Sequence, residues 1–419
     1  MHVVVLAEFA APSGGAEKVA LESARGLAEL GIAVSYLQGV SGPVDPLLDH
    51  PRIRRIDLGL PDIWTRGAVA GAVSGVWHRV AAERVGSALA ALPPIDILHL
   101  HQWTRSLSPS VFPVLFATGV PVLVTLHDYF LACPNGVYYR FDRAEPCTLR
   151  PMSAACLAAP CDARSRLHKL VRVARTAILG RTLGSHPLHL VHVCDASRTR
   201  MASLFGGGVV HHRLDNPVRV HPVAPAEPER GDAVVYLGRL TREKGADLVA
   251  AAARAAGLPA LFIGAGPLEA ELRAAGAEVL GWQSPDAARA ILRARARALA
   301  APSRWFETGP LTVYEALADG IPVVASERSG ASEKVRNGET GFVVAPEAEA
   351  LAGVFSRLRD DACVAALGRA AHARFWSAPA TIASHARAAA DLYAHIMVSG
   401  RGPADCALQH ARAENSAPA

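Results

Sequence analysis

Two series of alternating β-rich and helical segments constrain the fold of this chain more than any other feature of its sequence. In the first series, residues 2–9 and 32–39 are β-rich and flank residues 16–30, whose apolar residues recur at helical spacing. Further β-rich segments lie at residues 96–103, 120–129 and 188–197. A parallel sheet covered by helices accounts for all of these segments.

The same alternation begins again in the second half of the chain. The β-rich segments there lie at residues 233–240, 260–264 and 323–326, and helical patterns at 246–256, 285–296 and 311–318 separate them. Residues 216–231 contain four prolines and no periodic pattern, which is typical of a stiff linker. We therefore predict an α/β protein of two tandem Rossmann-like domains that face each other across a cleft.

The predicted domain bounds follow from these segments and from the length of the chain. A single hydrophobic core stops growing near about 250–300 residues, so 419 residues favour two domains. The bounds are residues 1–215 for the first domain, 216–231 for the Pro-rich linker, 232–376 for the second domain, and 377–419 for a C-terminal helix and frayed tail.

Composition and charge exclude several classes of protein. With 51% hydrophobic and 19% charged residues, the chain is not of the disordered class. It has no run of about 18 consecutive apolar residues, which excludes an ordinary transmembrane helix. The net charge of +5 is too small for a nucleic-acid binder, but it suits an anionic substrate or a membrane surface. The first residues do not resemble a signal peptide, so we expect a cytoplasmic protein.

The most informative short segment contains Glu307 and Glu315, which lie on either side of a predicted helix start. Pro310 suits the first helical turn, where its missing N–H is not needed. The free backbone N–H groups of Leu311 and Thr312 would then form an anion site that fits a diphosphate. The alternative is that Glu307 caps the helix and Glu315 is a solvated helix residue.

Four segments of the second half resemble, in this order, the donor domain of glycosyltransferase family 4. They are GRLTREKG at residues 238–245, FIGAGPL at 262–268, the pair of glutamates, and GASE at 330–333. In the first half, the Gly-Gly pair at residues 14–15 and His-Asp at 127–128 agree as well, so the resemblance covers about residues 1–375. It implies a retaining, metal-independent GT-B enzyme that uses a nucleotide-sugar as co-substrate and requires no cofactor.

The resemblance implies specific roles for four charged residues of the second domain. Arg239 and Lys244 would bind the donor diphosphate and neutralise the leaving phosphate in place of a metal. Both follow the first strand of that domain, where ligands gather in α/β sheets. Glu307 would contact hydroxyls of the donor sugar, and Glu315 would contact the ribose. A surface ion pair is the alternative for Arg239.

Two pairs of glycines are further candidates. Gly264 and Gly266 would permit close backbone approach near the nucleotide, although ordinary turn glycines explain them equally well. Gly14 and Gly15 do not match the dinucleotide fingerprint. In the family the corresponding loop approaches the donor phosphate and the acceptor, which favours residues without side chains.

His127 lies at the carboxyl end of a predicted strand, where α/β domains place active residues. In the family a histidine at this position reaches the donor sugar from the acceptor domain; a core histidine is the alternative. Asp128 would hold either the imidazole or the acceptor. His99 and His101 share one face of the preceding strand, as structural or acceptor-side residues.

Two features after His127 are not explained by the resemblance. The first is a cluster of four cysteines, Cys133, Cys147, Cys156 and Cys161. Their spacings match no zinc knuckle, and they allow a structural zinc site, reduced thiols or a disulfide-capable insertion. Residues 164–181 then read as a basic amphipathic helix, which suits either anionic lipid or solvent. Its basic residues are Arg164, Arg166, Lys169, Arg172, Arg175 and Arg181.

These features together predict a retaining glycosyltransferase that transfers a sugar from a nucleotide-sugar donor to a glycan or lipid-linked acceptor. The family mechanism implied is a same-face reaction in which the leaving phosphate helps to deprotonate the acceptor. We expect a role in the synthesis of cell-surface polysaccharide or glycoconjugates, with the protein peripheral at the inner membrane face. The alternatives are a nucleotide-sugar epimerase of the same architecture and a non-catalytic nucleotide- or glycan-binding protein.

Overall fold

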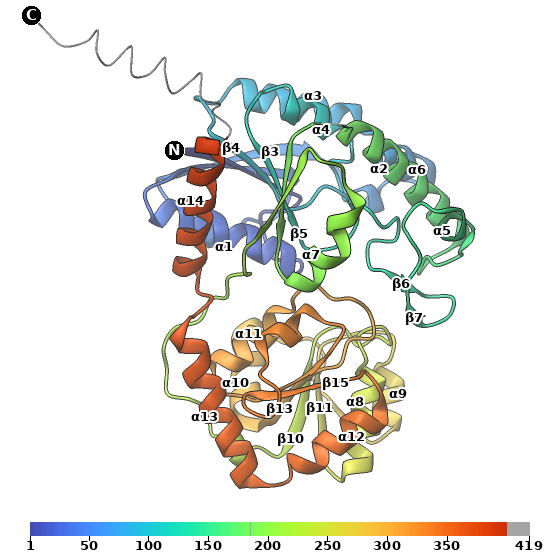
Figure 1. Ribbon diagram of the computed structural model, residues 1–419, viewed down its shortest axis with the longest axis vertical. Coiled ribbons are helices and arrows are strands. Elements are labelled where there is room, and N and C mark those ends of the chain that lie inside the picture. The colour runs from blue at the N-terminus through green and yellow to red at the C-terminus, as the bar shows by residue number, and fades with distance from the viewer. Residues whose placement is uncertain (185, 400–419) are drawn as a thin grey trace, which may run out of the picture.

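The computed structural model describes residues 1–184 and 186–399 and contains two parallel β-sheets, one above the other along the long axis of the molecule (Figure 1). The first sheet has seven strands in the order β3-β2-β1-β4-β5-β8-β9, and the second has six in the order β12-β11-β10-β13-β14-β15. Helices cover both sheets. The predicted fold class, α/β with two Rossmann-like domains, is confirmed.

Residues before the linker form the sheet of the first domain and most of its helices. Its sheet consists of β1 (His2–Ala7), β2 (Ala33–Val40), β3 (Ile53–Leu60), β4 (Ile97–Leu100), β5 (Val122–Leu126), β8 (Leu188–His192) and β9 (Val209–Arg213). Its helices are α1 (Gly15–Glu29), α2 (Ala68–Val76), α3 (Arg79–Ala90), α4 (Val111–Phe116), α5 (Ala154–Ala158), α6 (Arg166–Leu183) and α7 (Asp195–Met201). A small antiparallel pair, β6 (Tyr139–Arg140) and β7 (Glu145–Pro146), lies outside the sheet.

The second domain repeats this plan with shorter strands. Its sheet consists of β10 (Ala233–Leu237), β11 (Ala260–Ile263), β12 (Glu278–Val279), β13 (Ala296–Ala301), β14 (Val323–Ser326) and β15 (Gly341–Val344). Its helices are α8 (Ala246–Ala256), α9 (Glu269–Ala274), α10 (Pro285–Arg295), α11 (Leu311–Ala318), α12 (Ala348–Arg357) and α13 (Asp361–Ser377). A last helix, α14 (Ile382–Ser399), follows.

Each sheet has a hydrophobic core on both faces, because successive side chains of a strand point to opposite sides. In β1, Val4 and Leu6 belong to one core and Val3 and Val5 to the other, and all four are buried. Strands buried on both faces read as the continuous apolar runs from which the sheet was predicted.

Helix α14 does not stay with the domain that precedes it in sequence. It packs against α1, and Ala389, Tyr393 and Ile396 are buried in a core of the first domain. The chain therefore crosses between the domains twice, and the crossings lie side by side, since the N–H of Val218 donates to the carbonyl of Ala380 at 2.9 Å. The predicted tail from residue 400 onward lies outside the described residues.

A helix that spans a membrane needs about 20 consecutive, mostly apolar residues. None of the helices between residues 1 and 399, with residue 185 left aside, combines the length and the apolar composition needed to cross a bilayer.

Candidate active site

Lys244 and Glu307 form an ion pair at the carboxyl edge of the second sheet. Lys244 follows β10 in a loop that Gly245 closes with a φ of 80°, and Glu307 follows β13. Ser303 donates a hydrogen bond to the other carboxylate oxygen of Glu307 at 2.5 Å. Burial alone would raise the pKa of Glu307, but the Lys244 ammonium and the Ser303 hydroxyl hold that pKa below its usual value.

The Trp305 ring contacts both Lys244 and a second cation, Arg239. The Lys244 ammonium lies 5.3 Å from the centre of the Trp305 ring, and the Arg239 guanidinium lies 5.7 Å from it. Both distances suit a cation–π interaction. Arg239 has no carboxylate partner within the described part of the chain, so its charge is available to an anion.

Helix α11 begins beside this cluster and contains Glu315. Pro310 occupies the N-cap position, one residue before the expected first turn, and the helix starts at Leu311. The N–H groups of Leu311 and Thr312 are the first two of the helix and have no acceptor within it. Glu315 is not a solvated residue: its carboxylate lies 2.5 Å from the Lys18 ammonium of α1, in the other domain.

The first domain faces this cluster with the start of α1 and the end of β5. Gly14 is the N-cap of α1, and a Cβ atom on Gly15 would lie 3.8 Å from the side chain of Leu311. The carbonyl of His127, directly after β5, accepts a hydrogen bond from the Thr308 hydroxyl at 2.8 Å. The predicted site residues of both domains therefore meet where the carboxyl ends of the two sheets face each other.

A buried histidine orients the ring of His127. His101 Nδ1 and His127 Nε2 lie 3.1 Å apart in a hydrogen bond, and the two rings are stacked. Burial, and after it the nearby His385, lowers the pKa of His127 to about 3, so its imidazole is neutral at physiological pH. His99 bonds instead to Tyr393 at 2.7 Å and to a threonine of β5, which gives it a structural role.

Asp128 does not hold the imidazole of His127, which was one of two expected roles. Its carboxylate accepts a hydrogen bond from the N–H of Phe130 at 2.9 Å. Burial raises the pKa of Asp128 to about 6, and the Phe130 hydrogen bond only partly opposes this shift. A role toward an acceptor is the one of the two that stays a prediction.

Gly264 and Gly266 have a packing role that the sequence did not reveal. A Cβ atom on Gly264 would lie 2.0 Å from the carbonyl oxygen of Gly238, and one on Gly266 would lie 2.4 Å from that of Leu240. The loop after β11 thus rests on the backbone of the loop that leads to Arg239. The two glycines are required by this contact whether or not a nucleotide lies near them.

Several residues of this region were not predicted as site residues. Glu22, one turn after Lys18 on α1, is fully buried, and neither of its carboxylate oxygens has a hydrogen-bond partner. Glu333 accepts hydrogen bonds from the N–H groups of Asp195 and Ala196, at 2.9 and 2.8 Å, and so caps α7 of the other domain. Glu333 belongs to the GASE segment at residues 330–333, but no local pattern in the sequence indicated its partners.

The four clustered cysteines do not form the zinc site that their number allowed. All four, Cys133, Cys147, Cys156 and Cys161, are buried and free of disulfides. The Lys169 ammonium lies 3.0 Å from Cys161 Sγ. In a metal site this position beside the sulfur would be taken by the ion or by another ligand. Within residues 1–184 and 186–399 no three His, Cys, Asp or Glu side chains are arranged to hold a metal ion. Reduced thiols are the alternative that this geometry fits.

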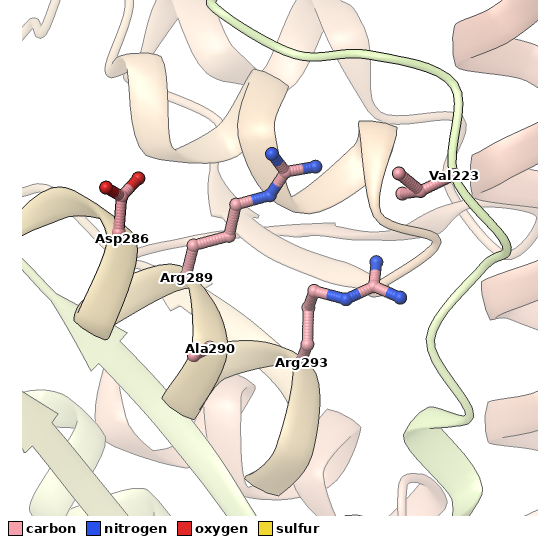
Figure 2. A pocket seen from close by; sticks show the side chains of 5 residues that line it. All are labelled: Val223, Asp286, Arg289, Ala290 and Arg293. Carbon is pink, nitrogen blue, oxygen red and sulfur yellow. The ribbon is translucent and has the colours of Figure 1, made fainter.

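A surface hollow on α10 lies apart from all of these residues. It is lined by Val223, Asp286, Arg289, Ala290 and Arg293 (Figure 2). Both arginines are already paired with the buried Asp319, at 2.7 and 2.6 Å. None of the predicted site residues lines this hollow, and its cations are committed within the protein.

Two family models match the chain. The model described as "Glycosyl transferases group 1" matches residues 219–371, and "Glycosyl transferase 4-like domain" matches residues 14–163. A D-inositol 3-phosphate glycosyltransferase of Mycobacterium avium is 29% identical over 92% of this chain and 94% of its own length.

Solved structures agree in fold. Sucrose-phosphate synthase of Thermosynechococcus elongatus matches with a TM-score of 0.70 and 19% identity, over 95% of this chain and 99% of that one. HepE of Anabaena, in complex with UDP and glucose, matches with a TM-score of 0.64 and 19% identity, over 94% of this chain and all of that one. The two family models, the relative and the shared architecture agree with the motifs of the sequence: the chain belongs to glycosyltransferase family 4 and is a glycosyltransferase with the GT-B fold.

Proposed function

We propose that this glycosyltransferase is retaining and metal-independent, and that it transfers a sugar from a nucleotide-sugar to a glycan or lipid-linked acceptor. The role that we propose for it is the synthesis of cell-surface polysaccharide or glycoconjugates. The observation that supports this most is the contact network of Arg239, Lys244, Trp305 and Glu307. It holds two cations and a carboxylate at the carboxyl edge of the second sheet, where α/β proteins bind ligands.

The donor diphosphate is expected to bind Arg239 and Lys244, with the N–H groups of Leu311 and Thr312 as further donors. Its negative charge would compete with Glu307 for the Lys244 ammonium. Glu307 is then free to accept hydrogen bonds from hydroxyls of the sugar.

Glu315, one turn further along α11, would accept hydrogen bonds from the ribose. The Lys18 ammonium, 2.5 Å away, fixes this carboxylate from the other domain. Ribose recognition in this proposal therefore requires both domains, since only their approach brings Lys18 to Glu315.

The reaction proposed at this site breaks the bond between the anomeric carbon and the phosphate oxygen and forms a bond from the acceptor oxygen on the same face. The proton of the acceptor hydroxyl passes to the departing phosphate oxygen. Arg239 and Lys244 stabilise the charge that develops on the phosphate. His127 is neutral because of its low pKa, so it would hold a sugar hydroxyl by a hydrogen bond rather than supply a positive charge.

The test of this assignment compares substitutions of Lys244 and Glu307 with a control substitution in the loop of Lys244. Lys244→Ala is expected to lower kcat about 10²–10³-fold, because one fixed cation at the leaving phosphate is lost. Glu307→Ala should abolish transfer, because the carboxylate proposed to hold the sugar hydroxyls is lost. Arg242→Ala is the matched control: Arg242 belongs to the same loop but pairs with Glu271 at 2.8 Å on the surface. Full activity of Lys244→Ala, with folding verified by circular dichroism, contradicts the assignment.

The donor and the acceptor are identified by separate measurements. A panel of nucleotide-sugars is screened by thermal shift, since a ligand of the native state raises the melting temperature. Product analysis with and without acceptor then separates a transferase from the other classes. An epimerase converts the donor without acceptor, and a binding protein leaves it unchanged. Because a relative is named for D-inositol 3-phosphate, this compound belongs in the acceptor panel beside glycans and lipid-linked sugars.

A further inference from the structure

We propose that the first domain docks on an anionic lipid bilayer through an exposed apolar surface formed by α2, α6 and the segments beside them. The surface consists of Trp64, Val69, Val73, Leu157, Leu167 and Leu170, all of them exposed. Helices α2 and α6 are in contact with each other and lie with α5 at one end of the first domain (Figure 1). Large exposed apolar patches mark sites of interaction.

The first turns of helix α6 expose two leucines, while the basic residues in its middle point inward, the reverse of the orientation expected from sequence. Leu167 and Leu170 have exposed fractions of 70% and 61%. Lys169 and Arg175, in contrast, are buried. Arg172 forms an ion pair with the buried Asp162 at 3.0 Å. The basic residues in the middle of this helix therefore cannot reach lipid, and its leucines can.

Helix α2 extends the same surface without any charge. Its nine residues, AVAGAVSGV, include no acidic or basic side chain. Val69 and Val73, one turn apart, have exposed fractions of 80% and 63%. A surface helix of a water-soluble domain usually presents charged residues to solvent, so an uncharged outer face indicates contact with something apolar.

Exposed cations outnumber exposed acids in the segments that carry this apolar surface, and this charge selects the kind of partner. The guanidinium of Arg164 stacks over the Trp64 ring at 3.8 Å, which places a positive charge at the edge of an exposed aromatic residue. In residues 62–84 and 150–183 the exposed arginines are Arg79, Arg84, Arg150, Arg164, Arg166 and Arg181. The one exposed acidic residue of these two segments is Glu83.

An apolar face in segments with an excess of exposed arginines matches an anionic bilayer, whose acyl chains lie beneath negative headgroups. Tryptophan and arginine prefer the headgroup level because each combines an apolar body with a polar end. We therefore assign the surface to a lipid bilayer rather than to a protein partner. A lipid-linked acceptor would then reach the first domain without leaving the membrane.

The experiment is vesicle flotation of the full chain, first with phosphatidylcholine alone and then with added phosphatidylglycerol. We expect binding to the anionic vesicles that weakens as salt is raised. Leu167→Asn with Leu170→Asn should lower the partition coefficient about 100-fold, at about tenfold for each leucine removed from the bilayer. Arg166→Glu should weaken binding to anionic vesicles only.

The matched control is Val398→Asn, since Val398 is 73% exposed on α14, away from this surface. This variant should bind vesicles as the unchanged chain does. Equal loss in the control, or no binding of the unchanged chain to anionic vesicles, overturns the proposal. So does self-association through this face, which analytical ultracentrifugation would show as a dimer that the double leucine variant cannot form. Circular dichroism shows whether the variants fold.

Discussion

Glu22 shows how burial alone changes the chemistry of one residue. Its carboxyl is fully buried on α1 and has no hydrogen-bond partner. Burial raises the pKa of Glu22 to about 8, and the nearby Lys18 only partly opposes this shift. Because Lys18 also pairs with Glu315, Glu22 lies one contact away from the candidate ribose site.

The raised pKa of Glu22 predicts that the protein loses stability as pH rises. Between pH 4.5, the ordinary value, and pH 8 the folded state binds the proton and the unfolded state does not. The free energy of unfolding therefore falls by about 1.4 kcal/mol per pH unit from this group. Glu22→Gln should remove this contribution.

Urea unfolding at pH 5.5 and pH 7.5 measures the effect. Over these two pH units the unchanged chain should lose about 2–3 kcal/mol more than Glu22→Gln does. The control is Glu29→Gln, an exposed residue of the same helix that pairs with Arg25. Parallel pH dependence of the unchanged chain and Glu22→Gln would show that Glu22 is ionised when folded.

For single residues, the sequence predicted which side chains lie at the candidate site but not which of them contact each other. Lys244, Glu307 and His127 were named because motifs and strand ends placed them at the carboxyl edges of the sheets. Glu22 was not, because a glutamate on an amphipathic helix is an ordinary surface residue until a second domain covers it. Long-range contacts of this kind have no local signal.

Among the elements, the loop after β11 depends most visibly on its glycines. Gly264 has a φ of 141°, and its Cβ position is occupied by the Gly238 carbonyl. Gly264→Ala should therefore destabilise the protein by about 2–4 kcal/mol, from backbone strain and overpacking together. The control is Gly276→Ala, whose φ of 85° is also positive but whose Cβ would meet open space.

Denaturant unfolding of the two variants separates the causes. Gly276→Ala should cost only the strain, about 1–2 kcal/mol. If Gly264→Ala costs no more than Gly276→Ala, then the contact between the two loops is not tight. In that case the packing role assigned to this glycine is wrong.

Helix α6 shows what an element's sequence pattern does and does not determine. The spacing of apolar and basic residues predicted a helix within residues 164–181, and α6 runs over Arg166–Leu183. The pattern did not reveal which face is buried, since Lys169 and Arg175 find partners in the interior. Arg175 lies over the Phe130 ring at 4.5 Å, and Lys169 reaches a cysteine.

For the whole molecule, the sequence predicted two domains from the restart of the alternation after the prolines. It did not predict that α14 returns to the first domain, because the pattern of an amphipathic helix shows that one face is buried but not which surface buries it. The return places both crossings side by side, and the Thr308–His127 and Lys18–Glu315 contacts join the domains elsewhere. These contacts bring both halves of the candidate site together.

The central claim is that this two-domain site transfers a sugar with retention and without a metal. The most direct test is proton NMR of the product formed from the nucleotide-sugar that the thermal-shift panel selects, in the presence of EDTA. The anomeric coupling constant should show the same configuration in the product as in the donor. An inverted anomer, or transfer that stops with EDTA and resumes with a divalent cation, would contradict the account.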